Sequence, residues 1–459
     1  MGFYTLDDFF GPLNLNAQTG AVDQLTFDES SSYVHDSVRL SSTQLVRYSQ
    51  PPTVTVDPNP RVESHTETAY PFVVNFQTLG GSLSTLGGSF SPGVVFDTSY
   101  GGTDLYIPQT GANEPVTVNG YGVIAPDQID VGFDGANDQN ATTVEGVPVN
   151  SPFPATAAQS TLDQLTSTLQ VYAPSGDAML NVDDEAALGA ESYTLRVLYP
   201  PAIPAGVLTR TNAAAITYGS GIHFALNAGG HGNSIAVMGV LTGTTASINA
   251  GAGSDTITVG NSLGDLNDIG GLLTIDGGAG TNSLTIQDTG DGFGEDYQLN
   301  ASQFYRSANS RSVPAITIDF SRMSDVKFDA SDNSGVNDIV VGGTPTGVPV
   351  SIDSGTGAAD LAVDDLDELR GPLTFDFTPG TRSLSINDET ASANATYDVA
   401  NTGATLLTFP FTTVQRTGAA LIKLLGELSS LYLAPGQLQN NTVNVDGIAA
   451  GTSAVIRTG

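Results

Sequence analysis

The sequence contains no cysteine and no tryptophan, and only two of its 14 basic residues, Lys327 and Lys423, are lysines. The lack of cysteine excludes disulfides, zinc–thiolate and iron–sulfur sites, and any cysteine nucleophile. The sequence also has no run of about 18 uncharged apolar residues, and its first residues lack the basic region of a signal peptide. We therefore expect no membrane insertion, and either a cytoplasmic chain or a segment of a longer exported protein.

Negative charge dominates the ionisable residues that are present. The 48 acidic residues outnumber the 14 basic ones and give a net charge of −34 over 459 residues. Such a surface repels phosphate groups, and no basic run is available to neutralise several of them, so nucleic acid and anionic membranes are poor partners. Solubility and the attraction of divalent cations are the two uses of this charge that the sequence favours.

An internal repeat of about 100 residues organises the chain. The segment 273–288 (LTIDGGAGTNSLTIQD) reappears as 373–388 (LTFDFTPGTRSLSIND), and weaker copies lie at 169–184 and 13–29. The second leucine of each copy gives spacings of 155, 104 and 100 residues, at Leu25, Leu180, Leu284 and Leu384. A Tyr-x-Leu or Tyr-x-Val follows each later copy, at Tyr193, Tyr297 and Tyr397.

This period divides the chain into six parts. The long first spacing predicts an insertion of roughly 50 residues, which the prolines and paired glycines between residues 51 and 81 place in the first repeat. We expect a partial repeat at 1–40, an insertion at 41–100, a repeat remainder with an irregular loop at 101–160, and further repeats at 161–262, 263–364 and 365–459, the last of them truncated.

Short alternating segments predict an all-β chain. In 256–259, 284–286 and 442–445, aliphatic residues alternate with small polar ones, and Gly or Asx residues separate such segments. We predict a right-handed parallel β-helix, or solenoid, of about 100-residue repeats, each contributing about four coils. Leu180, Leu284 and Leu384 should then take equivalent inward positions. Tandem immunoglobulin-like β-sandwiches are the alternative.

One segment has the composition of a helix. Residues 417–433 (TGAALIKLLGELSSLYL) form an amphipathic helical pattern, but they align with strand-like segments of the other repeats. Because homologous repeats stack on one another, we predict β structure here as well.

Three short sequence segments resemble known protein families. Residues 251–259 (GAGSDTITV) and 278–286 (GAGTNSLTI) distantly resemble the nonapeptide of hemolysin-type (RTX) proteins. Together with 210–218 (RTNAAAITY), they also resemble giant bacterial, planctomycete-like surface proteins and adhesins built from β-helical repeats. This second resemblance covers about 160–459. It implies an extracellular or cell-surface segment of a larger exported protein.

The same resemblance implies a structural or adhesive function, as a rigid spacer or a binding surface. The partners it implies are other copies or neighbouring repeats of the same protein, or a cell-surface glycan or protein. A rod of stacked coils needs no catalytic constellation for either role.

Calcium is the one cofactor that the sequence suggests. An RTX coil needs Asp at the fifth position of each nonapeptide, and the chain has Asp255 there in one copy but Asn282, Ala359 and Asn233 in others. We expect no resident cofactor, with a calcium-stabilised RTX-like module as the alternative function. The weak metal candidates are Asp255, Asp364, Asp365, Asp367 and Glu368, with further acidic groups at 183–185 and 288–291.

A polysaccharide-active β-helix enzyme is the second alternative. Such a glycan hydrolase or lyase uses paired carboxylates, and the chain offers Asp183 with Asp184 and a Gly-His-Gly centred on His231. No Asn-Thr-Asp and no Arg-x-Lys accompanies them, and Ser334 or Gln439 stands at the position of His231 in other repeats. We therefore predict no catalytic residues and no enzymatic activity.

Overall fold

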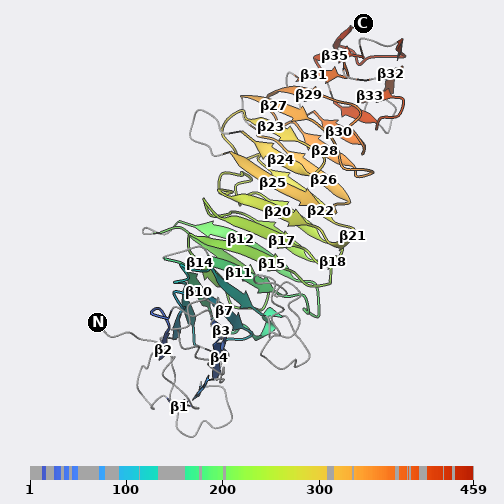
Figure 1. Ribbon diagram of the computed structural model, residues 1–459. Coiled ribbons are helices and arrows are strands. Elements are labelled where there is room, and N and C mark those ends of the chain that lie inside the picture. The colour runs from blue at the N-terminus through green and yellow to red at the C-terminus, as the bar shows by residue number, and fades with distance from the viewer. Residues whose placement is uncertain are drawn as a thin grey trace, which may run out of the picture. The chain divides into compact units, whose positions relative to one another are not determined.

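The computed structural model contains β-strands and one short 3-10 turn, η2 (Leu162–Gln164), with no α-helix among the residues it describes (Figure 1). These are residues 13–16, 25–32, 36–40, 44–49, 72–77, 93–112, 114–132, 161–174, 178–199, 203–307, 315–332, 335–377, 382–389, 391, 394–402, 411–426, 428–436 and 440–457. The prediction of an all-β chain is confirmed.

The chain divides into two compact units. The first comprises residues 1–231 and 243–251, and the second comprises residues 232–242 and 252–459. Each unit contains strands of two large sheets, and the chain passes back and forth between them, so that one coil consists of one strand from each sheet.

In the first unit, the two sheets are named after their strands β7 and β8. The β7 sheet consists of β1 (Leu13–Asn16), β3 (Asp36–Leu40), β4 (Gln44–Ser49), β5 (Phe72–Gln77), β7 (Thr103–Ile107), β9 (Asp127–Val131), β11 (Ala178–Asp183), β15 (Ile222–Asn227) and β17 (Thr245–Asn249). The β8 sheet consists of β2 (Leu25–Asp28), β6 (Val94–Asp97), β8 (Val116–Asn119), β10 (Leu169–Tyr172), β12 (Ser192–Leu198), β13 (Ala205–Arg210) and β14 (Ile216–Tyr218).

In the second unit, the sheets are named after β27 and β28. The β27 sheet consists of β20 (Leu272–Asp276), β23 (Asp296–Leu299), β24 (Gln303–Arg306), β25 (Ile316–Ser321), β27 (Val336–Val341), β29 (Ala358–Val363), β31 (Arg382–Asn387), β35 (Ser430–Ala434) and β37 (Ser453–Ile456). The β28 sheet consists of β16 (Ser234–Val237), β19 (Thr256–Val259), β22 (Ser283–Gln287), β26 (Asp325–Asp329), β28 (Val350–Asp353), β30 (Leu373–Asp376), β32 (Thr396–Thr402), β33 (Phe411–Arg416), β34 (Ile422–Leu425) and β36 (Thr442–Val445).

Most neighbouring strands pair in parallel and in register, which places like residues above one another. One inward row of the β28 sheet runs through Ile257, Leu284, Val326, Val350 and Leu373, all of them at most 1% exposed. The alternation of aliphatic and small polar residues produces this row, because every second side chain of a strand points to the same face. Parallel ladders of this length favour the predicted β-helix over immunoglobulin-like sandwiches, whose strands pair antiparallel.

The glycine-rich phrases form a small parallel pair beside these sheets. Strand β18 (Ala252–Gly253) pairs with β21 (Ala279–Gly280). Gly280 has φ +123°, and a Cβ atom added to it would lie 1.6 Å from the carbonyl oxygen of Gly253. Only glycine can therefore occupy this close approach between the two coils.

Antiparallel meanders interrupt the parallel ladders at the repeat period. Each consists of three consecutive strands of one sheet, and they are β3–β4–β5, β12–β13–β14, β23–β24–β25 and β32–β33–β34. The Tyr-x-Leu or Tyr-x-Val phrases lie in the first strand of the later three. The sequence did not predict the meanders.

Each meander lies in the opposite sheet from the next one within its unit. Between β23–β25 and β32–β34 the chain forms six single strands, β26, β27, β28, β29, β30 and β31, that alternate between the sheets. The spacing between meanders is therefore three and a half coils, where the sequence predicted about four coils in each repeat. The prediction that Leu180, Leu284 and Leu384 point inward is confirmed, since their exposed fractions are 0%, 0% and 1%. However, Leu284 lies in the β28 sheet and Leu384 in the β27 sheet.

The described part of 417–433 contains strands, as its alignment predicted. Residues 422–425 form β34 and residues 430–434 form β35, and both pair in parallel with an adjacent coil. Tertiary pairing therefore prevails over helix propensity in this segment. The predicted insertion at 41–100 and the irregular loop within 101–160 lie partly outside the described residues. Their described portions belong to β4 to β9 of the two sheets.

Candidate functional site

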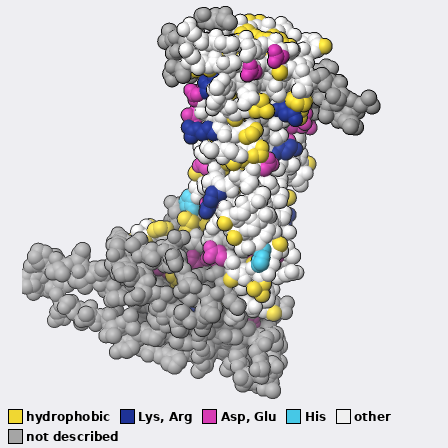
Figure 2. All heavy atoms as spheres, turned by 90° about the vertical axis from the view of Figure 1, so that its right-hand side faces the viewer, with side chains coloured by type: hydrophobic (Ala, Val, Ile, Leu, Met, Phe, Trp, Pro, Cys, Tyr) yellow, Lys and Arg dark blue, Asp and Glu magenta, His cyan; other side chains and the backbone are white. Residues whose placement is uncertain are grey.

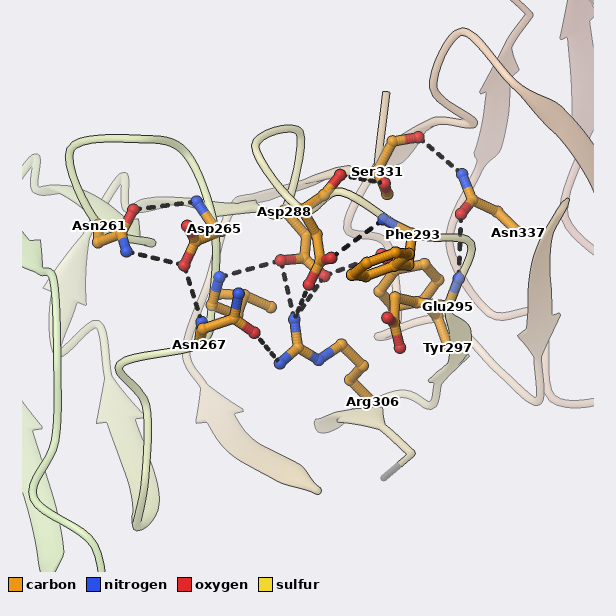
Figure 3. Close-up of polar contacts among 12 residues, drawn as sticks. Asn261, Asp265, Asn267, Asp288, Phe293, Glu295, Tyr297, Arg306, Ser331 and Asn337 are labelled. Carbon is orange, nitrogen blue, oxygen red and sulfur yellow. Dashed lines mark hydrogen bonds and ion pairs between the residues drawn. The ribbon is translucent and has the colours of Figure 1, made fainter. Parts of the chain in front are cut away.

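A buried arginine meets a buried carboxylate beside each meander. In the third repeat, Arg306 ends β24, and its Nη1 lies 3.0 and 2.9 Å from the two carboxylate oxygens of Asp288 (Figure 3). Both side chains are completely buried. The phenol of Tyr297, in β23, donates a 2.8 Å hydrogen bond to the same carboxylate. Asp288 therefore joins the first two strands of the meander to the coil that precedes them.

The same cluster also holds an earlier turn of the chain. The backbone N–H of Leu266 donates to Asp288 Oδ1 at 2.9 Å, and Arg306 Nη2 donates to the side-chain oxygen of Asn267 at 2.9 Å. Residues 266, 288, 297 and 306 are thereby tied together across more than one coil. Figure 3 shows the side chains of Asn267 and Asp288 pointing toward the Arg306 guanidinium.

The cluster recurs in the second and fourth repeats. The Asp accepts from the N–H of a leucine 22 residues before it, from a tyrosine nine residues after it, and from the meander arginine. The members are Leu162, Asp184, Tyr193 and Arg210 in the second repeat, and Leu366, Asp388, Tyr397 and Arg416 in the fourth. Arg210 lies 2.8 Å from Asp184, and Arg416 lies 2.9 Å from Asp388.

The first repeat keeps the ion pair but not the tyrosine. Arg47 Nε lies 3.2 Å from Glu29 Oε1, and both side chains are buried. Val38 pairs with Arg47 across the first two strands of the meander, as Tyr297 pairs with Arg306. The longer glutamate occupies the place of the aspartate, nine residues before Val38.

Burial shifts the ionisation of these groups. Desolvation raises the pKa of Asp288 to about 6, although Arg306 opposes the shift. Burial, followed by the hydrogen bond to Asp388, raises the pKa of Tyr397 to about 12, and the same causes raise those of Tyr193 and Tyr297. The tyrosines are therefore neutral hydrogen-bond donors at physiological pH.

These clusters connect chain segments and are closed to substrate. Asp184, Asp288 and Asp388 are each completely buried, and each accepts hydrogen bonds from at least three groups. A general base or a nucleophile must reach a reacting atom, which these carboxylates cannot do. What the arrangement does is fix a meander to its neighbouring coils.

The first metal candidate, Asp255, lies in a row of hydrogen-bonded residues at the starts of strands. Its side chain is buried and accepts the N–H of Asn233 at 2.7 Å, while its own N–H donates to the side chain of Asn282 at 3.1 Å. The N–H of Asn282 donates in turn to Ser324 Oγ at 3.3 Å. Burial raises the pKa of Asp255. Asn233, Asp255 and Asn282, which stand at the RTX fifth position, are therefore connected from coil to coil by hydrogen bonds.

The acidic cluster at 364–368 is divided among different partners. Asp367 pairs with Arg416, Glu368 lies 3.0 Å from Arg370, and Asp365 accepts the N–H of Asp367 at 2.8 Å. The N–H of Asp364 donates to the carbonyl of Val341. Across the described ranges, no three Asp, Glu or His side chains converge as they would around a metal ion.

The remaining candidates have separate surroundings. Asp183 accepts from the Asn227 amide at 2.7 Å, whereas its neighbour Asp184 belongs to the Arg210 cluster. His231 is exposed in the loop after β15. The structure therefore does not bring Asp183, Asp184 and His231 together as one interacting group.

On the face shown in Figure 2, the described charged side chains are dispersed among neutral ones.

The sequence analysis singled out some members of the clusters without connecting them. These were the acidic groups at 183–185 and 288–291, the three tyrosines and, within the segment 210–218, Arg210, whereas Arg306 and Arg416 were not singled out. The constant nine-residue Asp–Tyr spacing was the signal that could have found the pair.

No family model matches this sequence, and no curated protein matches it. The part of the chain that the structure describes holds no apolar helix of membrane-spanning length.

Proposed function

We propose that this chain is a structural or adhesive segment of a secreted or cell-surface repeat protein, acting as a rigid spacer or as a binding surface. In this proposal the chain is a right-handed parallel β-helix of about 100-residue repeats. The parallel in-register rows and the meanders at the repeat period support it.

The observation that carries the proposal is the recurrence of the buried arginine cluster. An enzyme needs one accessible constellation of catalytic groups, whereas a scaffold needs the same internal junction in every repeat. Here a buried arginine and a buried carboxylate form that junction in successive repeats. We therefore propose no catalytic activity, and we propose other copies, neighbouring repeats, or a cell-surface glycan or protein as partners.

The absence of cysteine allows a direct test of rigidity in the second unit. Thr258, Thr285, Lys327, Ser351, Thr374 and Lys423 occupy one row of paired positions across the β28 sheet. Spin labels at Thr258→Cys and Lys423→Cys are separated by five strand spacings, or roughly 24 Å between Cα atoms. Electron spin resonance should give one narrow distance distribution near this value.

A matched pair controls for motion of the labels themselves. Thr258→Cys with Ser351→Cys spans three of the same spacings, and its distribution should have a similar width at a shorter distance. A distribution that broadens strongly with the number of strands would contradict a rigid spacer. Adsorption of the labelled chain to intact cells or to purified cell-wall glycan would then separate a binding surface from a passive spacer.

A further inference from the structure

The outward face of the β27 sheet carries an uncharged row of side chains with a tyrosine at each end. Outward positions alternate along each strand with residues that are buried in the core. Strand pairing aligns these positions across six successive strands, β24, β23, β27, β29, β31 and β35 (Figure 1). This tyrosine row consists of Tyr305, Gln298, Val340, Ala362, Ser385 and Tyr432. All six side chains are at least partly exposed.

The two tyrosines are far enough apart to contact one extended ligand at two points. Five strand spacings separate Tyr305 from Tyr432, or roughly 24 Å between Cα atoms. Val340, Ala362 and Ser385, between them, have short side chains. The row therefore leaves the middle of the face low and uncharged between two aromatic rings.

Hydrogen-bonding side chains form a second row on one side of the tyrosine row. In the same strand order from β23 to β35, it consists of Asp296, Asp338, Asp360, Ser383 and Ser430. The hydroxyl of Ser383 donates to Asp360. Partial desolvation, followed by the charges of Asp296 and Asp360, raises the pKa of Asp338. This side of the row accepts hydrogen bonds and repels anions.

Polar groups also flank the other side of the tyrosine row. Asn300, Asp364 and Asn387 each stand two residues after a member of the row. Asp364 and Asn387 are exposed. Arg457 Nη1, beyond β37, donates to the phenol of Tyr432 at 3.5 Å. The uncharged row is thus bordered on both sides by groups that bind hydroxyls.

This arrangement matches the chemistry of a sugar chain. The faces of a sugar ring present C–H groups, which pack on the negative face of an aromatic ring, while its hydroxyls point sideways and donate to carboxylates. An acidic polymer is disfavoured by the flanking carboxylates and by the net charge of −34. A peptide strand is disfavoured because β-augmentation needs a free sheet edge, whereas each of these six strands has a paired strand on both sides.

We propose that the tyrosine row binds a linear, uncharged polysaccharide, which crosses the strands and contacts both Tyr305 and Tyr432. This proposal rests on the function proposed above and names the partner of its binding surface. The equivalent row of the β28 sheet contains no aromatic residue and includes both lysines of the chain; it consists of Thr258, Thr285, Lys327, Ser351, Thr374 and Lys423. Binding is therefore assigned to one face of the second unit.

Calorimetric titration of the whole chain with defined oligosaccharides tests this assignment. The probes are uncharged β-1,4-linked hexasaccharides of glucose, of N-acetylglucosamine and of mannose, and at least one of them should bind. The corresponding disaccharide is too short to contact both tyrosines and should bind about tenfold more weakly or worse. Tyr305→Ala and Tyr432→Ala should each weaken hexasaccharide binding about tenfold. An oligogalacturonate of the same length should not bind.

A matched pair of variants distinguishes the tyrosine row from the rest of the surface. Ala362→Gln places a larger side chain in the middle of the row and should weaken hexasaccharide binding. Ser351→Gln makes a similar change in the row of the β28 sheet and should leave binding unchanged. Both positions point outward, and amide hydrogen exchange of β28 and β29 checks that the coils remain folded.

Three results would overturn the proposal. They are the absence of binding by all three hexasaccharides, binding that survives both tyrosine substitutions and Ala362→Gln, and equal binding of the oligogalacturonate. The spin-label distances described above are measured independently. A narrow distribution combined with any of these results would reject the polysaccharide site and leave the rigid spacer standing.

Discussion

Replacement of Arg416 with methionine tests whether the buried clusters hold the meanders in place. Arg416 Nη1 lies 3.1 and 2.9 Å from the two oxygens of Asp388, which is completely buried. Methionine fills a comparable space but, among the residues that the structure describes, leaves the carboxylate with Tyr397 and the N–H of Leu366 as hydrogen-bond donors. An uncompensated buried charge of this kind costs about 3–5 kcal/mol.

The remaining hydrogen bonds place the expected loss near the lower end of this range, at about 3 kcal/mol. Hydrogen exchange should show this loss as a lower opening free energy for the amides of β32, β33 and β34. Strands of the first unit should keep their protection, because the coils of a repeat structure contact mainly their neighbours. Local opening is the appropriate quantity, since a chain of 459 residues need not unfold in one step.

Arg370→Met is the matched control. Its partner is Glu368 at 3.0 Å, but the two side chains are 55% and 49% exposed, and such pairs contribute about 0–1 kcal/mol. Combining Arg416→Met with Asp388→Leu removes both buried charges and should restore most of the lost stability. A loss below about 1 kcal/mol for Arg416→Met alone would refute the idea that the buried charge requires its arginine.

Three further outcomes follow from the same structure. Tyr397→Phe removes one hydrogen bond to the buried Asp388 and should lower the opening free energy of β32 by about 1.5–3 kcal/mol in hydrogen exchange, less than Arg416→Met. Leu284→Ala empties a completely buried inward position and should cost about 2–5 kcal/mol, confined to the coils around β22; loss of protection in distant coils would contradict this. If no calcium site is occupied, a chelator should leave the melting temperature unchanged; a rise of many degrees with millimolar calcium, abolished by Asp364→Asn with Asp365→Asn, would instead support the RTX-like alternative.

The inward rows could be predicted from sequence because they depend on local alternation alone. Leu284 and Leu384 are each preceded and followed by small polar residues, and Leu180 is followed by Asn181 and then Val182, so the alternation defines the face of each leucine without knowledge of its neighbours. The sheet to which each leucine belongs depends on how many times the chain crosses between sheets. Between Leu284 and Leu384 that number is odd, so the two leucines lie in different sheets, and the local alternation of residues does not record it.

The contacts between the arginines and the cluster acids were missed for a related reason. The distance from the cluster acid to the tyrosine is constant at nine residues, but the distance to the arginine is 26, 18 and 28 residues in the second, third and fourth repeats. The intervening β-hairpins differ in length, whereas strand pairing restores the contact in every case. A spacing search therefore detects the tyrosine but not its partner.

The spacing of three and a half coils means that each repeat contains an odd number of crossings between the two sheets. This odd number constrains how such a chain can lengthen by duplication of repeats. Within a unit, duplication of one repeat would move every later strand from one sheet to the other. All the outward side chains beyond the duplication would then be displayed on the opposite side. Duplication of two repeats returns each later strand to its original sheet. A ligand that binds the outward side chains of one sheet would therefore find equivalent side chains only at every second repeat. Lengthening that preserves a surface should therefore proceed in pairs.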